Sequence, residues 1–282
     1  LYAELGDAGF EPAREAYLAA LQSDDTAGRV GCRVIEQLAN LEARCGDKLV
    51  DQGRQAEGLS LLESAARRLL ALASAVDGQA ALNNPERAAL LGSTLKRQAA
   101  AQAQLGKPGW KAIAATLEAA AAAYRKAGGE SAADSYNTLN ALAFAWLAGC
   151  LPITPEDGAE LARRCGAEAS RRFAGSKSFW DAVGAPDAAV VAWLLSGKTA
   201  DPDEALRTAY RQLAREVPHT AREWDSVATQ LQLLARFLEL RQQPGDAERA
   251  ALLKQLADPE TAPPSAEQPK GRRRAPARKK AS

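Results

Sequence analysis

The sequence predicts an all-α protein, built as a degenerate tetratricopeptide-like stack of antiparallel helical hairpins. Three observations predict this fold class. Residues that favour helices, above all alanine, leucine, arginine, glutamate and glutamine, dominate the chain, whereas aromatic residues make up only 5% of it. Runs of β-branched residues are missing. Apolar side chains recur three and four positions apart, which is the pattern of amphipathic helices.

Glycine, proline and asparagine mark the expected ends of the helices. In chain order, we expect joints at 46–47, 77–78, 83–85, 107–109, 128–129, 149–155, 175–176, 184–186, 197–202, 218 and 244–245. The intervening segments carry one apolar face each, such as the one formed by Val34, Leu38 and Leu41. The order of segments and breakers therefore predicts helical hairpins along the whole body of the chain.

The apolar pattern fades after Leu256. We therefore predict one helical domain over residues 1–258 and a disordered tail rich in proline, alanine, lysine and arginine over residues 259–282. The tail holds seven lysines and arginines against the single acid Glu267. A solvated tail is the simpler interpretation, and a contact with nucleic acid or an acidic partner is the alternative. No aromatic residue stands among these cations, which argues against stacking on bases.

Composition argues against several classes of protein. The four cysteines form no CxxC pair and His219 is the only histidine, so we expect buried thiols rather than a zinc site or a disulfide framework. No apolar run approaches the ~20 residues of a membrane span, and we expect a cytoplasmic protein without cofactors. Because the chain begins at Leu1 and contains no methionine, we expect it to be a segment of a longer polypeptide.

Motifs that resemble enzyme signatures are chance matches. Ser93 and Lys96 have the S-x-x-K spacing of serine β-lactamases, but no S-D-N follows. The stretch "SGKTA" at 196–200 lacks the first glycine of a phosphate-binding loop and the last glycine of K-T-G. No activated nucleophile, paired carboxylates or metal ligands can be assembled, so the sequence predicts a protein that is not an enzyme.

The remaining aromatic residues and the histidine have structural interpretations. We expect the tryptophans of the C-terminal part, Trp180 within "SFWDAV", Trp193 and Trp224, to anchor the core of the hairpins. His219 follows a proline at a joint, and we expect it at the surface.

The stretch "ERAALLGSTLKRQA" at 86–99 contains a glycine where helix propensity alone favours alanine by about 1 kcal/mol. Gly92 matches the small residue of helix A in a tetratricopeptide unit, where the partner helix approaches closely. Ala120, Tyr124 and Ala127 match the A-x3-F/Y-x2-A spacing of helix B. These four residues are the predicted structural residues of the repeat. Looser units are expected over 135–173 and 203–240.

Polar side chains on two successive A helices form the candidate ligand site. Ser93, Lys96 and Arg97 lie on the first of these helices, and Tyr136 and Asn140 lie one turn apart on the next. Together they offer positive charge, hydrogen-bond donors and acceptors and an aromatic ring. This set would suit a small anionic ligand with a stackable ring, such as a nucleotide or its derivative.

A purely structural role for the same residues stays open. In that interpretation the two cations pair with acids such as Glu86 or Glu118, and Asn140 caps a neighbouring backbone.

Several stretches of the sequence resemble a known family, the bacterial tetratricopeptide-repeat sensor domain (TPR-S), which is similar to the central regulatory region of the apoptosis-signal-regulating MAP3 kinases. The bacterial family and the kinase region share a glycine, a lysine four residues later, a tyrosine, and then a Y-x-x-x-N motif. In this sequence the matching residues are Gly92, Lys96, Tyr124, Tyr136 and Asn140. The stretches that carry the resemblance are 34–44, 86–99, 121–129, 135–149 and 179–197.

The resemblance implies a regulatory role in bacterial conflict systems. Domains of this family are joined to effectors, namely CHAT proteases, TIR domains, trypsin-like proteases or phosphoesterases, and are proposed to sense nucleotide-derived signals. It thus implies a non-catalytic sensor that binds a small anionic ligand and controls an attached effector domain. The alternative is a tetratricopeptide scaffold whose groove binds a peptide or protein partner.

Overall fold

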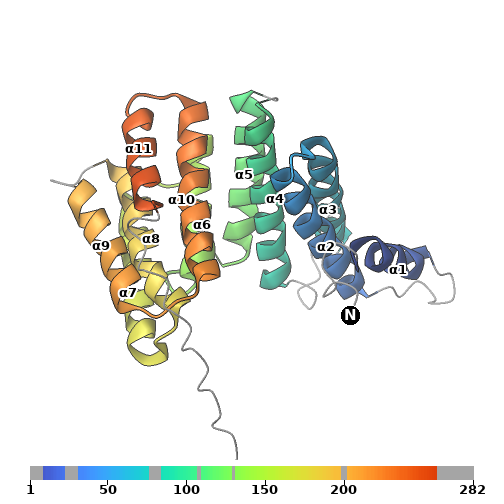
Figure 1. Cartoon of the computed structure of the whole chain (residues 1–282), viewed down its shortest axis with the longest axis horizontal. Helices are drawn as coiled ribbons and strands as arrows, with labels where there is room; N and C mark the ends of the chain where they lie inside the picture. The colour runs from blue at the N-terminus through green and yellow to red at the C-terminus, as the bar shows by residue number, and fades with distance from the viewer. Residues whose placement is uncertain are drawn as a thin grey trace, which may run out of the picture.

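The computed structural model describes residues 9–22, 31–75, 84–106, 109–128, 131–197 and 202–258. Within these ranges the protein consists of eleven α-helices and contains no strand, which confirms the predicted all-α class (Figure 1). The helices are α1 (Phe10–Gln22), α2 (Cys32–Asp51), α3 (Gln55–Ala75), α4 (Pro85–Leu105), α5 (Trp110–Lys126), α6 (Ser135–Ala148), α7 (Pro155–Ser176), α8 (Phe179–Ser196), α9 (Pro202–Glu216), α10 (Ala221–Arg241) and α11 (Asp246–Leu256). The predicted tail at 259–282 lies outside the described residues.

Local sequence explains most of the helix ends. The side chains of Asn84, Asp134 and Thr154 each accept a hydrogen bond from a backbone N–H in the first turn of the helix that follows. Thr220 and Glu223 form a capping box at the start of α10. Glycines at positive φ end α4, α6 and α8, as expected from the breakers at 107–109, 149–155 and 197–202.

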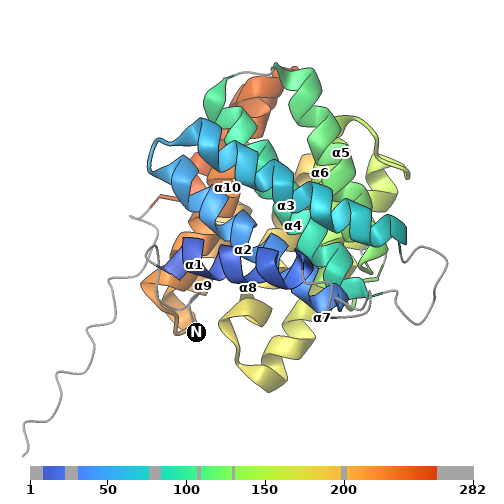
Figure 2. The same ribbon diagram turned by 90° about the vertical axis from the view of Figure 1, so that its right-hand side faces the viewer.

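The helices are arranged as a stack of antiparallel hairpins. The pairs α7–α8, α2–α3 and α4–α5 pack most extensively, followed by α5–α6 and then α10–α11. Contacts between α3 and α4 and between α5 and α6 join successive layers. Figure 2 views the stack from its N-terminal end, where α1, α2 and α3 lie in front of α4. None of the described helices is both long enough and apolar enough to cross a membrane.

The predicted repeat unit around Gly92 forms as expected. Gly92 lies in the middle of α4 and faces the ring of Tyr124 on α5, so closely that an added Cβ would come within 2.9 Å of that ring. Tyr124 and Ala120 are fully buried, and Ala127, which directly follows α5, is 3% exposed. The glycine is therefore explained by the close contact between the two helices.

Two predicted joints, at 46–47 and 184–186, are wrong. Gly46 lies inside α2 and contacts Gly58 of α3, where an added Cβ would come within 2.7 Å of a backbone oxygen. Gly184 lies inside α8 against Ala169 of α7, and Pro186 is buried in the same helix. Packing between the paired helices outweighs the low helix propensity of these residues.

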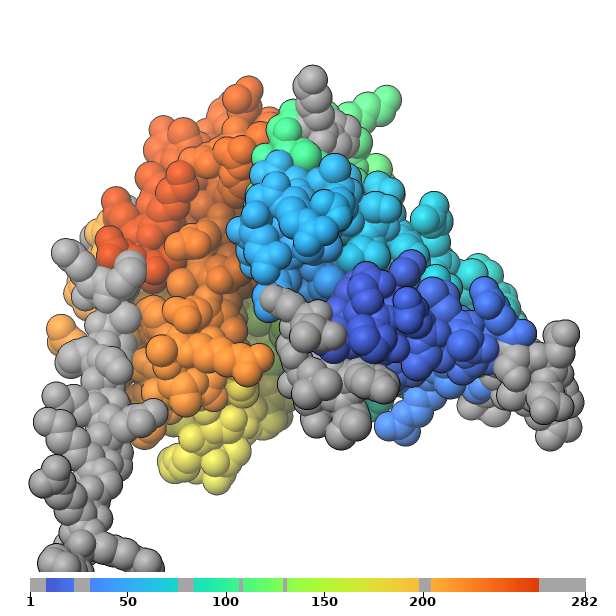
Figure 3. Space-filling model, turned by 45° about the vertical axis from the view of Figure 1, so that its right-hand side comes forward, coloured from blue at the N-terminus to red at the C-terminus, as the bar shows by residue number. Residues whose placement is uncertain are grey.

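The pairing of the C-terminal helices also differs from the prediction. The unit expected at 203–240 would pair α9 with α10, but α10 packs against α11, whereas α9 contacts α8 and α11. The stack also bends back on itself, so that α10 touches α4 and α6. In the space-filling view the C-terminal helices lie directly beside the N-terminal ones (Figure 3).

A buried ion pair fixes α10 and α11 to the end of α6. Arg241 and Asp246, whose side chains are 4% and 2% exposed, form two hydrogen bonds of 2.9 and 2.6 Å. The guanidinium also lies 3.9 Å from the ring centroid of Trp146 on α6. This cluster holds α10 in position beside α6, and both helices contribute to the cavity described next.

Candidate functional site

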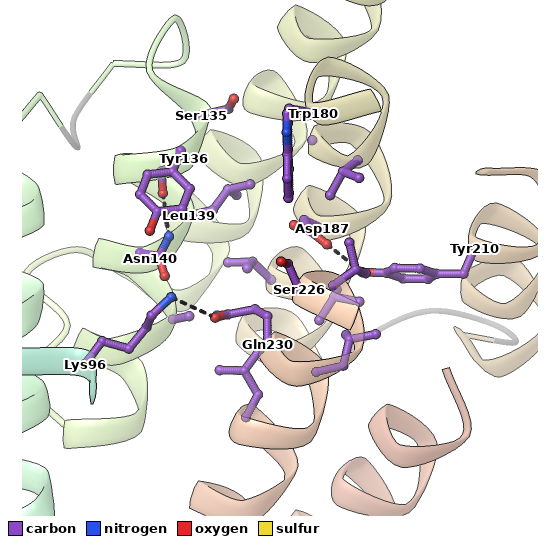
Figure 4. Close-up of a pocket in the computed structure, with 18 residues that line it drawn as sticks. Lys96, Ser135, Tyr136, Leu139, Asn140, Trp180, Asp187, Tyr210, Ser226 and Gln230 are labelled. Atoms are coloured by element: carbon purple, nitrogen blue, oxygen red, sulfur yellow. Dashed lines mark hydrogen bonds between the residues drawn. The ribbon is translucent and has the colours of Figure 1, made fainter. Parts of the chain in front are cut away.

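A cavity of about 510 Å³ lies where α4, α6, α8, α9 and α10 meet (Figure 4). Its volume lies within the range of small-molecule sites, roughly 300–1,000 Å³. Seven valines and leucines line its apolar part. Its polar and aromatic lining residues are Lys96, Ser135, Tyr136, Asn140, Trp180, Asp187, Tyr210, Ser226 and Gln230.

Lys96 reaches the cavity from α4. Its half-buried ammonium group donates a hydrogen bond of 3.1 Å to the amide oxygen of Gln230 on α10. Among the described residues it forms no ion pair, so neither Glu86 nor Glu118 neutralises it. A positive charge in a partly apolar cavity, held by a neutral amide, is left available to an anion.

Asn140 faces the same cavity from α6 and is 7% exposed. Its amide nitrogen donates a hydrogen bond of 2.8 Å to the backbone oxygen of Tyr136, as the structural interpretation expected. Its Oδ1 atom is buried and has no hydrogen-bond partner. Because a buried acceptor without a donor is costly, this oxygen is a strong candidate for contact with a bound molecule.

Tyr136 stands beside Lys96 at the edge of the cavity, with 55% of its surface exposed. Its hydroxyl lies 3.4 Å from that of Tyr124, and the two rings pack edge to face. Burial of the hydroxyl opposes ionisation, but the positive charges of Lys96 and Arg97 and the hydrogen bond to Tyr124 outweigh it, so the pKa of Tyr136 falls below its ordinary value. The cavity edge around Tyr136 thus has a positive potential.

The structure brings three of the five predicted ligand residues together and leaves two apart. Lys96, Tyr136 and Asn140 line one cavity, whereas Ser93 and Arg97 do not. The Ser93 hydroxyl donates to the backbone of Leu90. Arg97 lies 3.4 Å from a carboxylate oxygen of Asp47 on α2. Adjacent helical residues point about 100° apart, so Lys96 and Arg97 face different neighbours.

Helices α8 and α10 supply site residues that the sequence pattern did not indicate. Trp180 was expected in the core, but it is 54% exposed and lines the cavity opposite Tyr136 (Figure 4). Asp187 on α8 and Gln230 on α10 also line it. No local motif marks these residues, because they face Lys96 only after α10 folds back against α4.

Asp187 and Tyr210 form a polar pair on the far wall of the cavity. The hydroxyl of Tyr210, which is fully buried on α9, donates a hydrogen bond of 2.7 Å to Asp187. Removal from water raises the pKa of Asp187 to about 6, although the bond from Tyr210 and the charge of Lys96 act in the opposite direction. At neutral pH the carboxylate is therefore mostly ionised but poorly compensated.

His219 does not lie at the surface, contrary to expectation. It is half-buried between Phe179 and Trp224, with ring centroids 5.2 and 5.5 Å away, and its Nδ1 bonds to the backbone oxygen of Val217. Stacking against the two aromatic rings explains its burial.

The residues that could bind a metal ion, the four cysteines among them, are dispersed over the described part of the chain. It contains no group of three or more histidine, cysteine or acidic side chains that could hold a metal ion. The four cysteines are free. Cys165 alone is buried, and the other three are partly exposed, whereas the sequence predicted burial for all four.

Comparison with known families identifies the N-terminal half of the chain. Residues 9–145, which include α1 to α5 and most of α6, match the family model of the Tetratricopeptide Repeats-Sensor, TPR-S. No curated protein matches the chain. Lys96, Tyr136 and Asn140 lie inside the match, whereas Trp180, Asp187 and Gln230 lie beyond it. This match supports a TPR-S sensor domain over residues 9–145, and that family suggests a regulatory sensor module.

Proposed function

We propose that this chain is a non-catalytic sensor that binds a small anionic, nucleotide-derived ligand in the cavity between α4, α6, α8 and α10 and thereby controls an effector domain joined to it. The match of residues 9–145 to a sensor family supports a regulatory role. The effector would be of the CHAT protease, TIR, trypsin-like protease or phosphoesterase type, as the resemblance implies.

The observation that carries the proposal is the state of Lys96. Its ammonium group lines the cavity, bonds to a neutral amide and has no acidic partner among the described residues. An anionic group of a ligand would form a charge-assisted hydrogen bond with it, and such bonds are about twice as strong as neutral ones. The adjoining Asn140 oxygen, buried and unpaired, indicates that a second polar group belongs there.

Two aromatic side chains favour a ligand with a ring. Tyr136 and Trp180 are the most exposed large side chains of the lining and lie on opposite sides of the cavity (Figure 4). Stacking of a base on such side chains contributes about 1–3 kcal/mol by alanine substitution in single-strand binding proteins. A nucleotide combines this ring with the anion that Lys96 would bind.

The position of the cavity suggests how binding would be transmitted. Lys96 and Tyr136 belong to the matched sensor segment, whereas Trp180 and Gln230 belong to helices beyond it. A ligand that contacts both groups would favour whichever arrangement of α8 and α10 fits it best. Such control requires different affinities for two arrangements of the helices.

The test is a thermal-shift titration of the chain with nucleoside monophosphates, cyclic nucleotides and dinucleotides. A nucleotide that binds only the folded chain should raise the melting temperature, and the rise should continue with the logarithm of its concentration above the Kd. Lys96→Gln and Asn140→Ala should remove most of the shift while the helical circular dichroism persists. Lys111→Gln on α5 makes the same change of charge at an exposed site away from the cavity and should leave the shift unchanged.

The scaffold alternative predicts a different result. If no nucleotide shifts the unmodified chain, and a peptide or protein partner does so in a manner that Lys96→Gln abolishes, the groove would be a protein-binding surface. Equal nucleotide shifts in Lys96→Gln and the unmodified chain would place binding outside this cavity.

A further inference from the structure

Asp187 is the second charged residue of the cavity, and a phosphate-binding role does not account for it. It lies on α8, whereas Lys96 enters from α4 (Figure 4). Oδ1 accepts the hydrogen bond from Tyr210. Oδ2 has no hydrogen-bond partner among the described residues, and Figure 4 shows it pointing into the cavity. Tyr210 therefore fixes the carboxylate with one oxygen engaged and the other directed at the space a ligand would occupy.

Oδ2 of Asp187 faces the open space of the cavity, where a ligand that donates a hydrogen bond can reach it. Lys96 is the only cation that lines the cavity within the described part of the chain, and its ammonium bonds to Gln230 instead. Burial raises the pKa of Asp187 to about 6, so that at pH 7.5 the group is mostly ionised. The buried Oδ1 of Asn140 is a second acceptor without a donor. The cavity thus combines a cation bonded to a neutral amide with two acceptor oxygens that no described side chain engages, of which the one on Asn140 is buried.

Phosphate satisfies only the cation of this set. An ionised phosphate has no hydrogen to donate, and beside Asp187 it would add repulsion to an already poorly solvated charge. Hydroxyl or amino groups can satisfy both acceptors. Every ribonucleoside 5′-monophosphate carries two adjacent hydroxyls whatever its base, and an acidic side chain is a known partner of ribose hydroxyls in dinucleotide-binding folds.

We propose that Asp187, held by Tyr210, determines specificity by accepting hydrogen bonds from the ribose hydroxyls of the ligand, so that the cavity selects ribonucleotides over deoxyribonucleotides. This proposal rests on the proposed function, because it assumes that the ligand is nucleotide-derived. Lys96 binds the phosphate, Tyr136 and Trp180 hold the base, and Asp187 and Asn140 bind the sugar. A site that requires a hydrogen bond from the ligand discriminates strongly against an analogue that lacks it.

The experiment compares ribose and deoxyribose forms of one probe. The four ribonucleoside 5′-monophosphates and their 2′-deoxy and 3′-deoxy counterparts are titrated by calorimetry at pH 7.5 with EDTA present, so that no divalent cation bridges carboxylate and phosphate. For a ribonucleotide that binds, we expect at least one deoxy form to bind about tenfold or more weakly, the effect of one hydrogen bond to a charged group.

Matched variants assign the preference to Asp187. Asp187→Asn keeps the shape and can still accept the bond from Tyr210, but presents an amide NH₂ to the ligand. The charge-assisted bond to the ribose hydroxyl is then replaced at best by a weaker neutral one, so the ratio of ribose to deoxyribose affinity should fall several-fold. Tyr210→Phe should reduce the ratio partly, because the carboxylate is then no longer held. Lys96→Gln should weaken both forms by a similar factor and leave the ratio unchanged.

The outcomes separate this proposal from the proposed function. If ribose and both deoxyribose forms bind the unmodified chain equally, or if Asp187→Asn retains the ratio, the role of Asp187 is refuted while nucleotide binding stands. If no monophosphate binds while a cyclic nucleotide or dinucleotide shifts the melting temperature, the role of Asp187 is refuted and nucleotide sensing stands. If none of these nucleotides binds, both proposals fail. Melting curves of each variant establish that it is folded in the titration.

Discussion

The hairpins α2–α3 and α4–α5 pack closely at their glycines, whereas α6, α8 and α10 are separated by a cavity. Gly46 meets Gly58 backbone to backbone, and Gly92 meets the ring of Tyr124, so neither contact leaves room for a methyl group. In the second region, Lys96 and Asp187 line a space of about 510 Å³.

The same two regions also differ in how their charged side chains are paired. Glu42 on α2 is completely buried, but Arg14 and Arg68 both bond to it. Lys96 and Asp187 bond only to neutral groups among the described residues. The N-terminal hairpins thus pair their buried charge with opposite charges. The described cavity lining leaves its charged residues without oppositely charged partners, which lowers stability, as binding sites commonly do.

The largest effect is expected from breaking the support of the cavity. Arg241→Met would leave the buried carboxylate of Asp246 with Arg249, 3.8 Å away, as its remaining cation. We expect a loss of about 3 kcal/mol in the free energy of unfolding, the lower end for a broken buried pair. Urea denaturation measures it. The same substitution at Arg163, whose ion pair with Glu160 is exposed, should cost less than about 1 kcal/mol. Similar losses at both sites would contradict the role assigned to the buried pair.

A smaller effect is expected at the closest helix contact. Gly58→Ala places a Cβ 2.5 Å from the backbone oxygen of Gly46, and a backbone atom cannot rotate away. Overpacking costs about 1–3 kcal/mol, from which better helix propensity recovers about 1 kcal/mol. We expect a net loss of about 2 kcal/mol, measured by thermal and urea unfolding. An unchanged stability would show that α2 and α3 can move apart freely.

Gly92→Ala tests the contact at the centre of the repeat. The new Cβ would lie 2.9 Å from the ring of Tyr124, a side chain that has no free space in which to rotate. We expect a net loss of about 1 kcal/mol, because the gain in helix propensity partly offsets the clash. Gly175→Ala in α7, where a Cβ meets nothing within 4 Å, should instead stabilise slightly. A stabilised Gly92→Ala would refute the packing explanation of this glycine.

The effect expected at Asp187 is as small as that at Gly92 and has the opposite sign. Folding raises the pKa of Asp187 from 3.8 to about 6, so the ionised group opposes folding above pH 6, and this penalty disappears as the pH falls through 6 towards 4. The full shift corresponds to about 3 kcal/mol at about 1.4 kcal/mol per unit, and contact with solvent in the cavity reduces it. We expect Asp187→Asn to stabilise the chain by about 1 kcal/mol at pH 7.5.

Repeating the measurement at a lower pH provides the control for this prediction. The gain from Asp187→Asn should shrink at pH 4.5, where the native side chain is largely protonated, and Asp225→Asn at an exposed position of α10 should have no effect at either pH. A gain that is independent of pH would show that the carboxylate is well solvated in the fold.

Part of the candidate site could be predicted from sequence because it depends on local spacing. Tyr136 and Asn140 are one turn apart on any helix, and the repeat pattern places Lys96 on the helix that precedes them by one layer. Arg97 could not be assigned, since its partner Asp47 belongs to a helix 50 residues earlier in the chain. Trp180, Asp187 and Gln230 could not be found either, because no sequence motif records that α10 returns to α4.

The sequence by itself determined that the chain is helical, where most helices begin and end, and that the partner helix approaches closely at Gly92. These features follow from helix propensity, from helix capping and from the spacing of residues that lie close together in the chain. The tertiary structure decided that Gly46 and Gly184 continue their helices, because contacts with Gly58 and Ala169 outweigh a propensity cost of about 1 kcal/mol. The tertiary structure also creates the cavity. Its two charged residues come from helices far apart in the chain and are brought together only by the packing of those helices.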